Sequence, residues 1–148
     1  LSYCFAAKND NHRVMRENNN RSINRSRWKS SDLTMRLADN NSSEYLVFTQ
    51  LTHALRIKKN QPAFHPNATQ FTLQLKSGLF GFWRQSIDQK QSLFAITNLT
   101  RGGIKLQLGD LNLYSYAKWV ELLTGMQIDR YSEYKLSPYQ TIWITNQG

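Results

Sequence analysis

Histidine and cysteine, the side chains best suited to metal binding or nucleophilic catalysis, are few and widely spaced in this chain. His12, His53 and His65 share no ligand spacing with Cys4, the one cysteine, whereas a zinc site needs several such ligands brought together. Cys4 lies in an apolar run near the first residue, which favours packing over nucleophilic chemistry. The sequence contains no glycine-rich phosphate loop and no nucleophile elbow. We therefore expect neither a metal site nor a cofactor.

Aromatic side chains are a second source of chemistry, because their rings could stack on sugars in a binding groove. The candidates are Phe80, Phe82, Trp83, Trp119, Tyr139 and Trp143. The alternative is that these rings fill a small core, since each buries a large area. A two-residue period places Phe80 and Phe82 on one face and Trp83 on the other. Trp83 is therefore the better candidate for a surface contact.

A basic segment near the start of the chain is the third feature. The 148 residues include 19 Lys and Arg against 10 Asp and Glu, a net charge of +9. Much of the excess lies in Arg13, Arg16, Arg21, Arg25, Arg27 and Lys29. Such a cluster can bind nucleic-acid phosphates, but a solvated polar loop is the favoured explanation. No helix-turn-helix pattern, zinc spacing or aromatic RNA-binding motif accompanies it, so we expect no nucleic-acid partner.

The overall composition excludes several classes of protein. Hydrophobic residues make up 40% of the chain, enough for a packed core. No apolar run approaches the roughly 20 residues of a membrane span, and the first residues do not resemble a signal peptide. One cysteine cannot form an internal disulfide, which favours a reducing compartment, so we expect a cytoplasmic protein without a membrane partner. The lack of an initiator methionine suggests a fragment or a processed chain.

The elements that would position these residues fall into two units. All seven glycines follow Pro62, and we place a boundary there, between residues 1–62 and 63–148. Before it, Asn41 and Glu44 form a capping-box pattern that predicts a helix over 43–59, with basic residues in its last turn. An apolar stripe runs along this helix: Val47, Phe48, Leu51, Ala54 and Leu55. A weaker helical pattern covers 29–37.

After the boundary the hydrophobic period changes to two. Short alternating runs separated by Gly, Pro and Asn turns predict strands over 71–75, 79–84, 93–97, 104–108, 119–123 and 139–145. The run at 93–97 is continuously apolar, as expected for a strand buried on both faces. Six or more short strands at this spacing indicate an antiparallel β-sandwich.

Four stretches of sequence resemble a known enzyme family. They are Asn9-Asp10 with residues 19–25, the segment 61–68 (QPAFHPNA), the segment 79–84 (LFGFWR) and the segment 138–143 (PYQTIW). Together, and in this order, they resemble the C-terminal segment of the sucrose phosphorylase-like branch of the α-amylase superfamily, glycoside hydrolase family 13. The resemblance extends over essentially the whole chain.

This resemblance implies an α+β plan in which the end of a (β/α)₈ barrel precedes an antiparallel β domain. Residues 1–28 would be the final strand-to-helix loop, 43–59 the last barrel helix, and 63–148 the C-terminal domain. The stripe on the 43–59 helix would then face the barrel. In the chain by itself this stripe would face water, so self-association through residues 43–59 is expected.

The family reaction is retaining glucosyl transfer from sucrose or a related glucoside to phosphate, so the implied partners are a sugar and phosphate. It requires two carboxyl groups about 5 Å apart, and the family also uses a further aspartate. None of the ten acidic residues here lies in a matching motif. We therefore expect this chain alone to be inactive; the alternative is a stand-alone carbohydrate-binding sandwich using Trp83.

One sugar-binding residue is carried over by the resemblance. Arg21 matches the family arginine that hydrogen-bonds the glucosyl hydroxyls in the donor subsite, a role suited to the fixed fork of a guanidinium. Asn9 and Asp10 would shape the same loop, although an Asx turn explains them equally. The sequence departs from the family pattern at Cys4 and Lys8.

Overall fold

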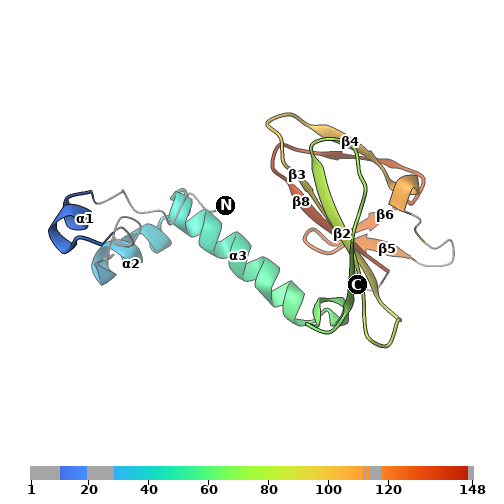
Figure 1. Ribbon diagram of the computed structural model, residues 1–148, viewed down its shortest axis with the longest axis horizontal. Coiled ribbons are helices and arrows are strands. Elements are labelled where there is room, and N and C mark those ends of the chain that lie inside the picture. The colour runs from blue at the N-terminus through green and yellow to red at the C-terminus, as the bar shows by residue number, and fades with distance from the viewer. Residues whose placement is uncertain (1–10, 20–28, 112, 114–117, 147–148) are drawn as a thin grey trace. The chain divides into compact units, whose positions relative to one another are not determined.

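The computed structural model describes residues 11–19, 29–111, 113 and 118–146. They divide into two compact units, Leu1–Leu55 and Arg56–Gly148. Figure 1 shows helices in the first unit and β-strands in the second. The sequence-based boundary at residue 62 remains a prediction.

The first unit contains helices α1 (Asn11–Glu17), α2 (Ser30–Ala38) and most of α3 (Ser43–Lys59). The helices expected over 29–37 and 43–59 are thus confirmed as α2 and α3. The N-cap of α3 differs from the prediction, because Ser42 Oγ, not Asn41, accepts the Tyr45 N–H at 3.0 Å. No helix among the described residues is both long and apolar enough to cross a membrane.

The apolar side of α3 is open to solvent. Only Val47 is buried, whereas three large side chains of the predicted stripe are between 50% and 54% exposed: Phe48, Leu51 and Leu55. These three residues are called the α3 stripe below.

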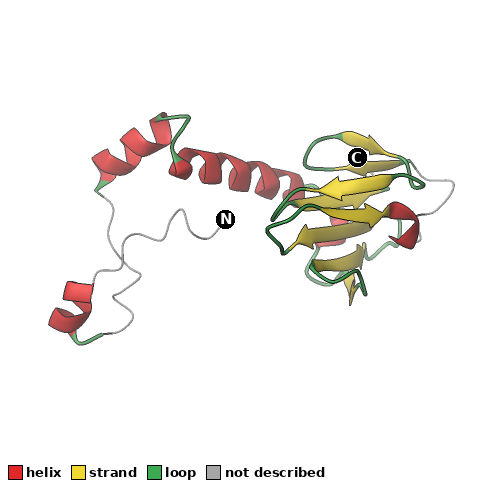
Figure 2. Ribbon diagram, turned by 90° about the horizontal axis from the view of Figure 1, so that it is seen from above, coloured by secondary structure: helices red, strands yellow, loops and turns green. Residues whose placement is uncertain are grey.

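The described residues of the second unit form eight strands. Their bounds are β1 (Thr69–Thr72), β2 (Leu79–Gln85), β3 (Ser92–Asn98), β4 (Ile104–Gln107), β5 (Trp119–Glu121), β6 (Met126–Ile128), β7 (Glu133–Leu136) and β8 (Thr141–Thr145). Two 3₁₀ helices, η2 (Pro62–Phe64) and η3 (Leu108–Leu111), complete it. One sheet has the order β1-β2-β3-β8-β5-β6, and β4 pairs with β7 in a second sheet. Figure 2 shows these strands in yellow.

All strand pairs are antiparallel, and the two sheets enclose the main core, so the predicted sandwich is confirmed. This core joins Phe94 and Ile96 of β3 to Leu106 of β4 and Leu136 of β7. The intervening β3 residues belong to a second cluster on the opposite face of the large sheet. The continuously apolar β3 is therefore buried on both faces, as its sequence predicts.

The second cluster fastens the start of the β domain to its sheet. Ala63 of η2 is fully buried with residues of β3. The Gln91 side chain, 1% exposed, accepts the Ala63 N–H at 2.8 Å and donates to Gln61 Oε1 at 2.6 Å. Residues 61–64 are consequently an integral part of this unit.

Candidate functional site

The resemblance predicts three sugar-site residues. Arg21, Asn9 and Asp10 all lie outside the described residues. The proposed donor-subsite role of Arg21 therefore remains a prediction.

Trp83, the expected surface aromatic, is half-buried on β2 and packs against the main core. Its cross-strand partner Phe71 on β1 stacks on it, with ring centroids 5.8 Å apart and planes inclined by 13°. Phe71 is 60% exposed. The open ring at this edge of the sheet is thus Phe71, not Trp83. The sequence predicts a strand that contains Phe71. It does not reveal that this strand lies at the edge of the sheet, with β2 as its one neighbour.

The other aromatic candidates divide between core and surface. Trp119 is buried in the main core beside Phe94, and Trp143 packs edge-on against Phe64 at 4.9 Å in the second cluster. Phe80 is about half-exposed and meets Phe82 at its edge. The predicted division of β2 into two faces is confirmed, because Trp83 packs in one cluster and Phe82 in the other. Packing explains the buried Trp119 and the partly buried Trp143.

Glu121 is the most buried acid among the described residues, and its carboxylate is fully engaged. Oε1 accepts the N–H groups of Leu123 and Trp143 at 3.1 and 3.0 Å. Oε2 accepts the N–H and hydroxyl of Thr124 at 2.8 and 2.6 Å. These four bonds hold the turn after β5 against β8. Such a carboxylate is occupied with the backbone and is poorly placed to serve as an acid or a nucleophile.

Two aspartates also serve turns. Asp88 Oδ1 accepts the Ser86 hydroxyl at 2.6 Å and the Lys90 N–H at 3.2 Å. These bonds, led by that from Ser86, lower the pKa of Asp88. Asp129 Oδ1 accepts the Tyr131 N–H at 3.0 Å. Both carboxylates stabilise chain reversals.

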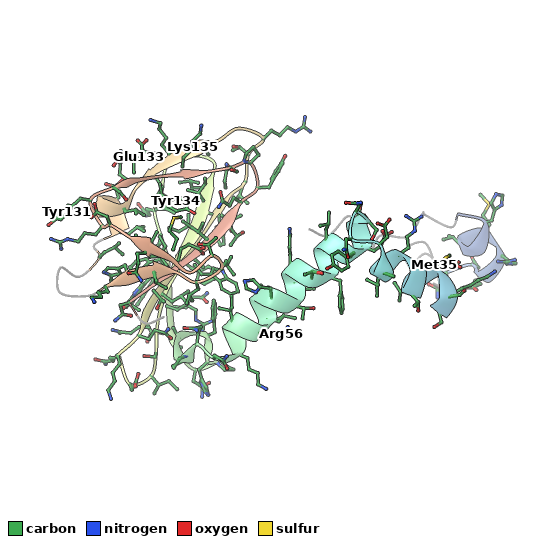
Figure 3. All side chains as sticks on the ribbon, turned by 180° about the vertical axis from the view of Figure 1, so that it is seen from behind. Met35, Arg56, Tyr131, Glu133, Tyr134 and Lys135 are labelled. Carbon is green, nitrogen blue, oxygen red and sulfur yellow. The ribbon has the colours of Figure 1, made fainter. Side chains whose placement is uncertain are left out.

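Strand β7 carries ion-pair residue Glu133 on one face and the partly buried phenol of Tyr134 on the other. Figure 3 shows Glu133 and Lys135 pointing outward from β7 and Tyr134 pointing into the domain. Glu133 pairs with Lys105 at 2.8 Å across the two-stranded sheet, which raises the pKa of Lys105. Burial, with a smaller contribution from the charge of Glu121, raises the pKa of Tyr134. Tyr134 therefore stays neutral near pH 7 and acts as a core side chain.

One open pocket of about 230 Å³ is lined by Leu108, Gly109, Leu113, Arg130 and Tyr131, which is below the usual range of about 300–1,000 Å³ for ligand sites. The Arg130 guanidinium lies 4.3 Å from the Tyr131 ring centroid. Among the residues that the structure describes, no three His, Cys, Asp or Glu side chains group as metal ligands.

Comparison with known sequences finds two curated relatives, while no protein-family model matches. Glucosylglycerate phosphorylase from Allomeiothermus silvanus is 33% identical over 124 residues, or 84% of this chain and 20% of that protein. Glucosylglycerate phosphorylase from Escherichia coli is 24% identical over 141 residues, or 95% of this chain and 24% of that protein. The chain thus spans between a fifth and a quarter of each relative.

Solved structures share the fold. AmyP in complex with maltose superimposes with a TM-score of 0.59 at 15% identity, over 72% of this chain and 22% of that chain. An Anoxybacillus α-amylase gives 0.53 at 16% identity, over 72% and 23%. The α-glucosyl transfer enzyme XgtA gives 0.51 at 14% identity, over 76% and 19%. At these identities the likeness concerns the fold alone.

The antiparallel sandwich and the sequence relatives point to the same class of protein. The chain resembles a C-terminal segment of an α-amylase superfamily enzyme, as its motifs predict. Both curated relatives are glucosylglycerate phosphorylases.

Proposed function

We propose that this chain is the C-terminal part of a glucoside phosphorylase, which transfers a glucosyl group to phosphate with retention of configuration. The observation that carries the proposal is 33% identity to a glucosylglycerate phosphorylase across 84% of the chain. Among glucosides related to sucrose, glucosylglycerate is therefore the substrate that we favour. The implied partners are this sugar and inorganic phosphate.

The chain alone is proposed to be inactive. Retaining transfer needs one carboxylate as nucleophile and one carboxylic acid, about 5 Å apart. The family resemblance assigns them to barrel strands that have no counterpart in this sequence. Among the described acids, Asp88, Glu121 and Asp129 are committed to backbone turns. A phosphorolysis assay of the chain should release no glucose 1-phosphate from either sucrose or glucosylglycerate.

A segment exchange tests the positive half of the proposal. The region of the Escherichia coli glucosylglycerate phosphorylase that matches this chain is replaced by residues 1–148. We expect the chimera to fold and to phosphorolyse glucosylglycerate, because the barrel then supplies the carboxylates and this chain supplies the last loop and the β domain. A folded chimera that turns over sucrose, or neither glucoside, would contradict the substrate assignment.

Arg21 is proposed to bind glucosyl hydroxyls in the chimera. Removing a charged hydrogen-bond donor from a sugar site costs about 1.5–3 kcal/mol, or roughly 10- to 150-fold in kcat/KM. Arg21→Ala should show a loss of this size, with a smaller loss for Arg21→Lys. Arg25→Ala, a change of the same charge in the same segment, is the matched control. Equal effects at Arg21 and Arg25 would reduce the role of Arg21 to general charge.

We also propose that the α3 stripe faces the barrel in the whole enzyme and associates with a second copy when the chain is alone. Burying exposed apolar surface drives such association. The double variant Phe48→Glu/Leu51→Glu should sediment as a monomer, whereas Gln50→Glu, on the same helix, should behave like the parent. A parent chain that is already monomeric at high concentration would contradict this proposal.

A cytoplasmic location is proposed from the cysteine content. A single cysteine cannot form an internal disulfide, and this is typical of proteins from reducing compartments. Fractionation of cells that express the full enzyme would test the location.

A further inference from the structure

We propose that the exposed ring of Phe71 is a surface contact site for a glucosyl unit. The choice of a glucosyl ligand rests on the function proposed above, whereas the site itself is argued from the geometry of the β domain.

The first argument is the rigidity of the ring. Phe71 is the exposed end of a row of aromatic side chains that crosses one face of the large sheet. The row contains Phe71, Trp83 and Phe94, which are successive cross-strand partners on β1, β2 and β3, and Trp119 on β5, which packs against Phe94. Trp83, Phe94 and Trp119 all pack in the main core. A ring that stacks on this support loses little conformational entropy when a ligand covers its other side.

The second argument is the position of Phe71 in the domain. Strand β1 is at the edge of the sheet, with β2 as its one neighbour. Alternation places Phe71 on the face of Trp83, whereas Ala63 and Phe64 of η2 pack on the opposite face. The open ring is therefore not on the face that residues 61–64 cover.

The third argument is the chemistry around the ring. Thr69 and Gln85 are paired two residues along from Phe71 and Trp83, on the same face of the sheet. Strand β1, with the sequence TQFT, contains no charged residue. Binding sites combine an apolar surface with a few polar groups that fix orientation. A neutral surface of one flat ring flanked by a hydroxyl and an amide suits a neutral ligand with an apolar face and a rim of hydroxyls, and a pyranose ring has this form.

The test is a titration of the full 148-residue chain with maltotriose, in which calorimetry and tryptophan fluorescence measure binding. We expect weak, saturable binding. Phe71→Ala should weaken it by about tenfold or more, while Phe71→Tyr, which keeps a stacked ring, should restore it. Phe80→Ala is the matched control, because Phe80 is also about half-exposed on the large sheet but on its other face. Phe80→Ala should bind like the parent.

Three results would overturn the proposal. They are the absence of saturable binding, equal weakening by Phe71→Ala and Phe80→Ala, and a dimer that dissociates on Phe71→Ala. The last would mean that the β1 edge pairs with a second copy instead. Thermal unfolding of each variant separates lost binding from lost folding, and a large exposed fraction at Phe71 predicts little change in Tm for Phe71→Ala. If the chain binds maltotriose but the chimera shows no phosphorolysis, the proposed function is refuted and the Phe71 site is not. If the chimera is active but the chain does not bind maltotriose, only the Phe71 site is refuted.

Discussion

Glu121 is a buried acid whose carboxylate oxygens serve the fold of the β domain. It is 1% exposed, and a carboxylate buried to this degree is costly unless its oxygens accept hydrogen bonds. Four donors from the β5 turn and from β8 supply them. The charge is thus balanced by local N–H and O–H dipoles, and the residue fixes the path of the chain.

Replacement of this carboxylate by an amide should be strongly destabilising. In Glu121→Gln, one acceptor oxygen becomes an NH₂ group that faces N–H donors, so the free energy of unfolding should fall by about 2–4 kcal/mol. Urea denaturation measures it. Glu133→Gln is the control, because its ion pair with Lys105 is exposed to solvent and should contribute little to stability. A Glu121→Gln variant as stable as Glu133→Gln would refute the structural role.

Asp88 gives a prediction about pH. Its hydrogen bonds to Ser86 and Lys90 favour the ionised form, so its native pKa lies below the ordinary value of 3.8. Ionised Asp88 therefore stabilises the turn above that ordinary value, and this contribution is lost as the pH falls through the lower native pKa. Carboxyl NMR titration should give the depressed pKa in the parent chain and a value closer to 3.8 in Ser86→Ala. An unchanged pKa in Ser86→Ala would mean that the hydroxyl is not the main cause.

At the scale of the element, strand β2 depends on a glycine. A Cβ on Gly81 would lie 2.8 Å from Leu75 Cδ1 and 3.2 Å from the Ala95 carbonyl oxygen. The backbone oxygen cannot retreat without disturbing the pairing of β2 with β3, in which Gly81 is the partner of Ile96. Close approach of strand and loop is therefore the reason for glycine here.

Gly81→Ala should destabilise the β domain by about 1–3 kcal/mol through overpacking. Gly109→Ala is a matched control, since a Cβ there would meet nothing within 4 Å. Thermal unfolding of the two variants gives the comparison. If Gly81→Ala unfolds at the same temperature as Gly109→Ala, the sheet has accommodated the methyl group and the packing argument fails.

The elements also show how far the sequence can be interpreted. Helix α3 and strands β2 and β3 were predicted nearly to the residue, because their apolar periods are long or continuous. Strands β6 and β7 were not predicted. β6 has three residues, and β7 alternates tyrosine and leucine with charged residues in a window of four. Their pairing depends on partners distant in sequence, which local patterns do not contain.

At the scale of the whole molecule, the division into units 1–55 and 56–148 predicts independent folding of the second. Residues 56–148 include both apolar clusters and all eight strands. We expect this segment alone to unfold cooperatively in urea, with the near-ultraviolet circular dichroism of packed tryptophans. A segment without such a signal would show that residues 1–55 are required for the sandwich.

A shorter segment tests the place of the boundary. Residues 65–148 lack the buried Ala63 and both side-chain bonds of Gln91 to residues 61 and 63. A buried amide without partners is costly, so this segment should be less stable than 56–148 by about 2 kcal/mol or more. If the two segments are equally stable, the folded β domain begins after Phe64.

The amino-acid sequence alone determined the two kinds of secondary structure, the antiparallel sandwich and the resemblance to a C-terminal segment of the α-amylase superfamily. These follow from local hydrophobic period, turn residues and ordered motifs, which are properties of neighbouring residues. Tertiary structure decided which aromatic ring meets solvent and which acid is buried, because both depend on the order of strands in the sheet. The two-residue period of β2 predicted the face on which Trp83 lies. It could not reveal that Phe71, on the edge strand β1, stacks on the Trp83 ring.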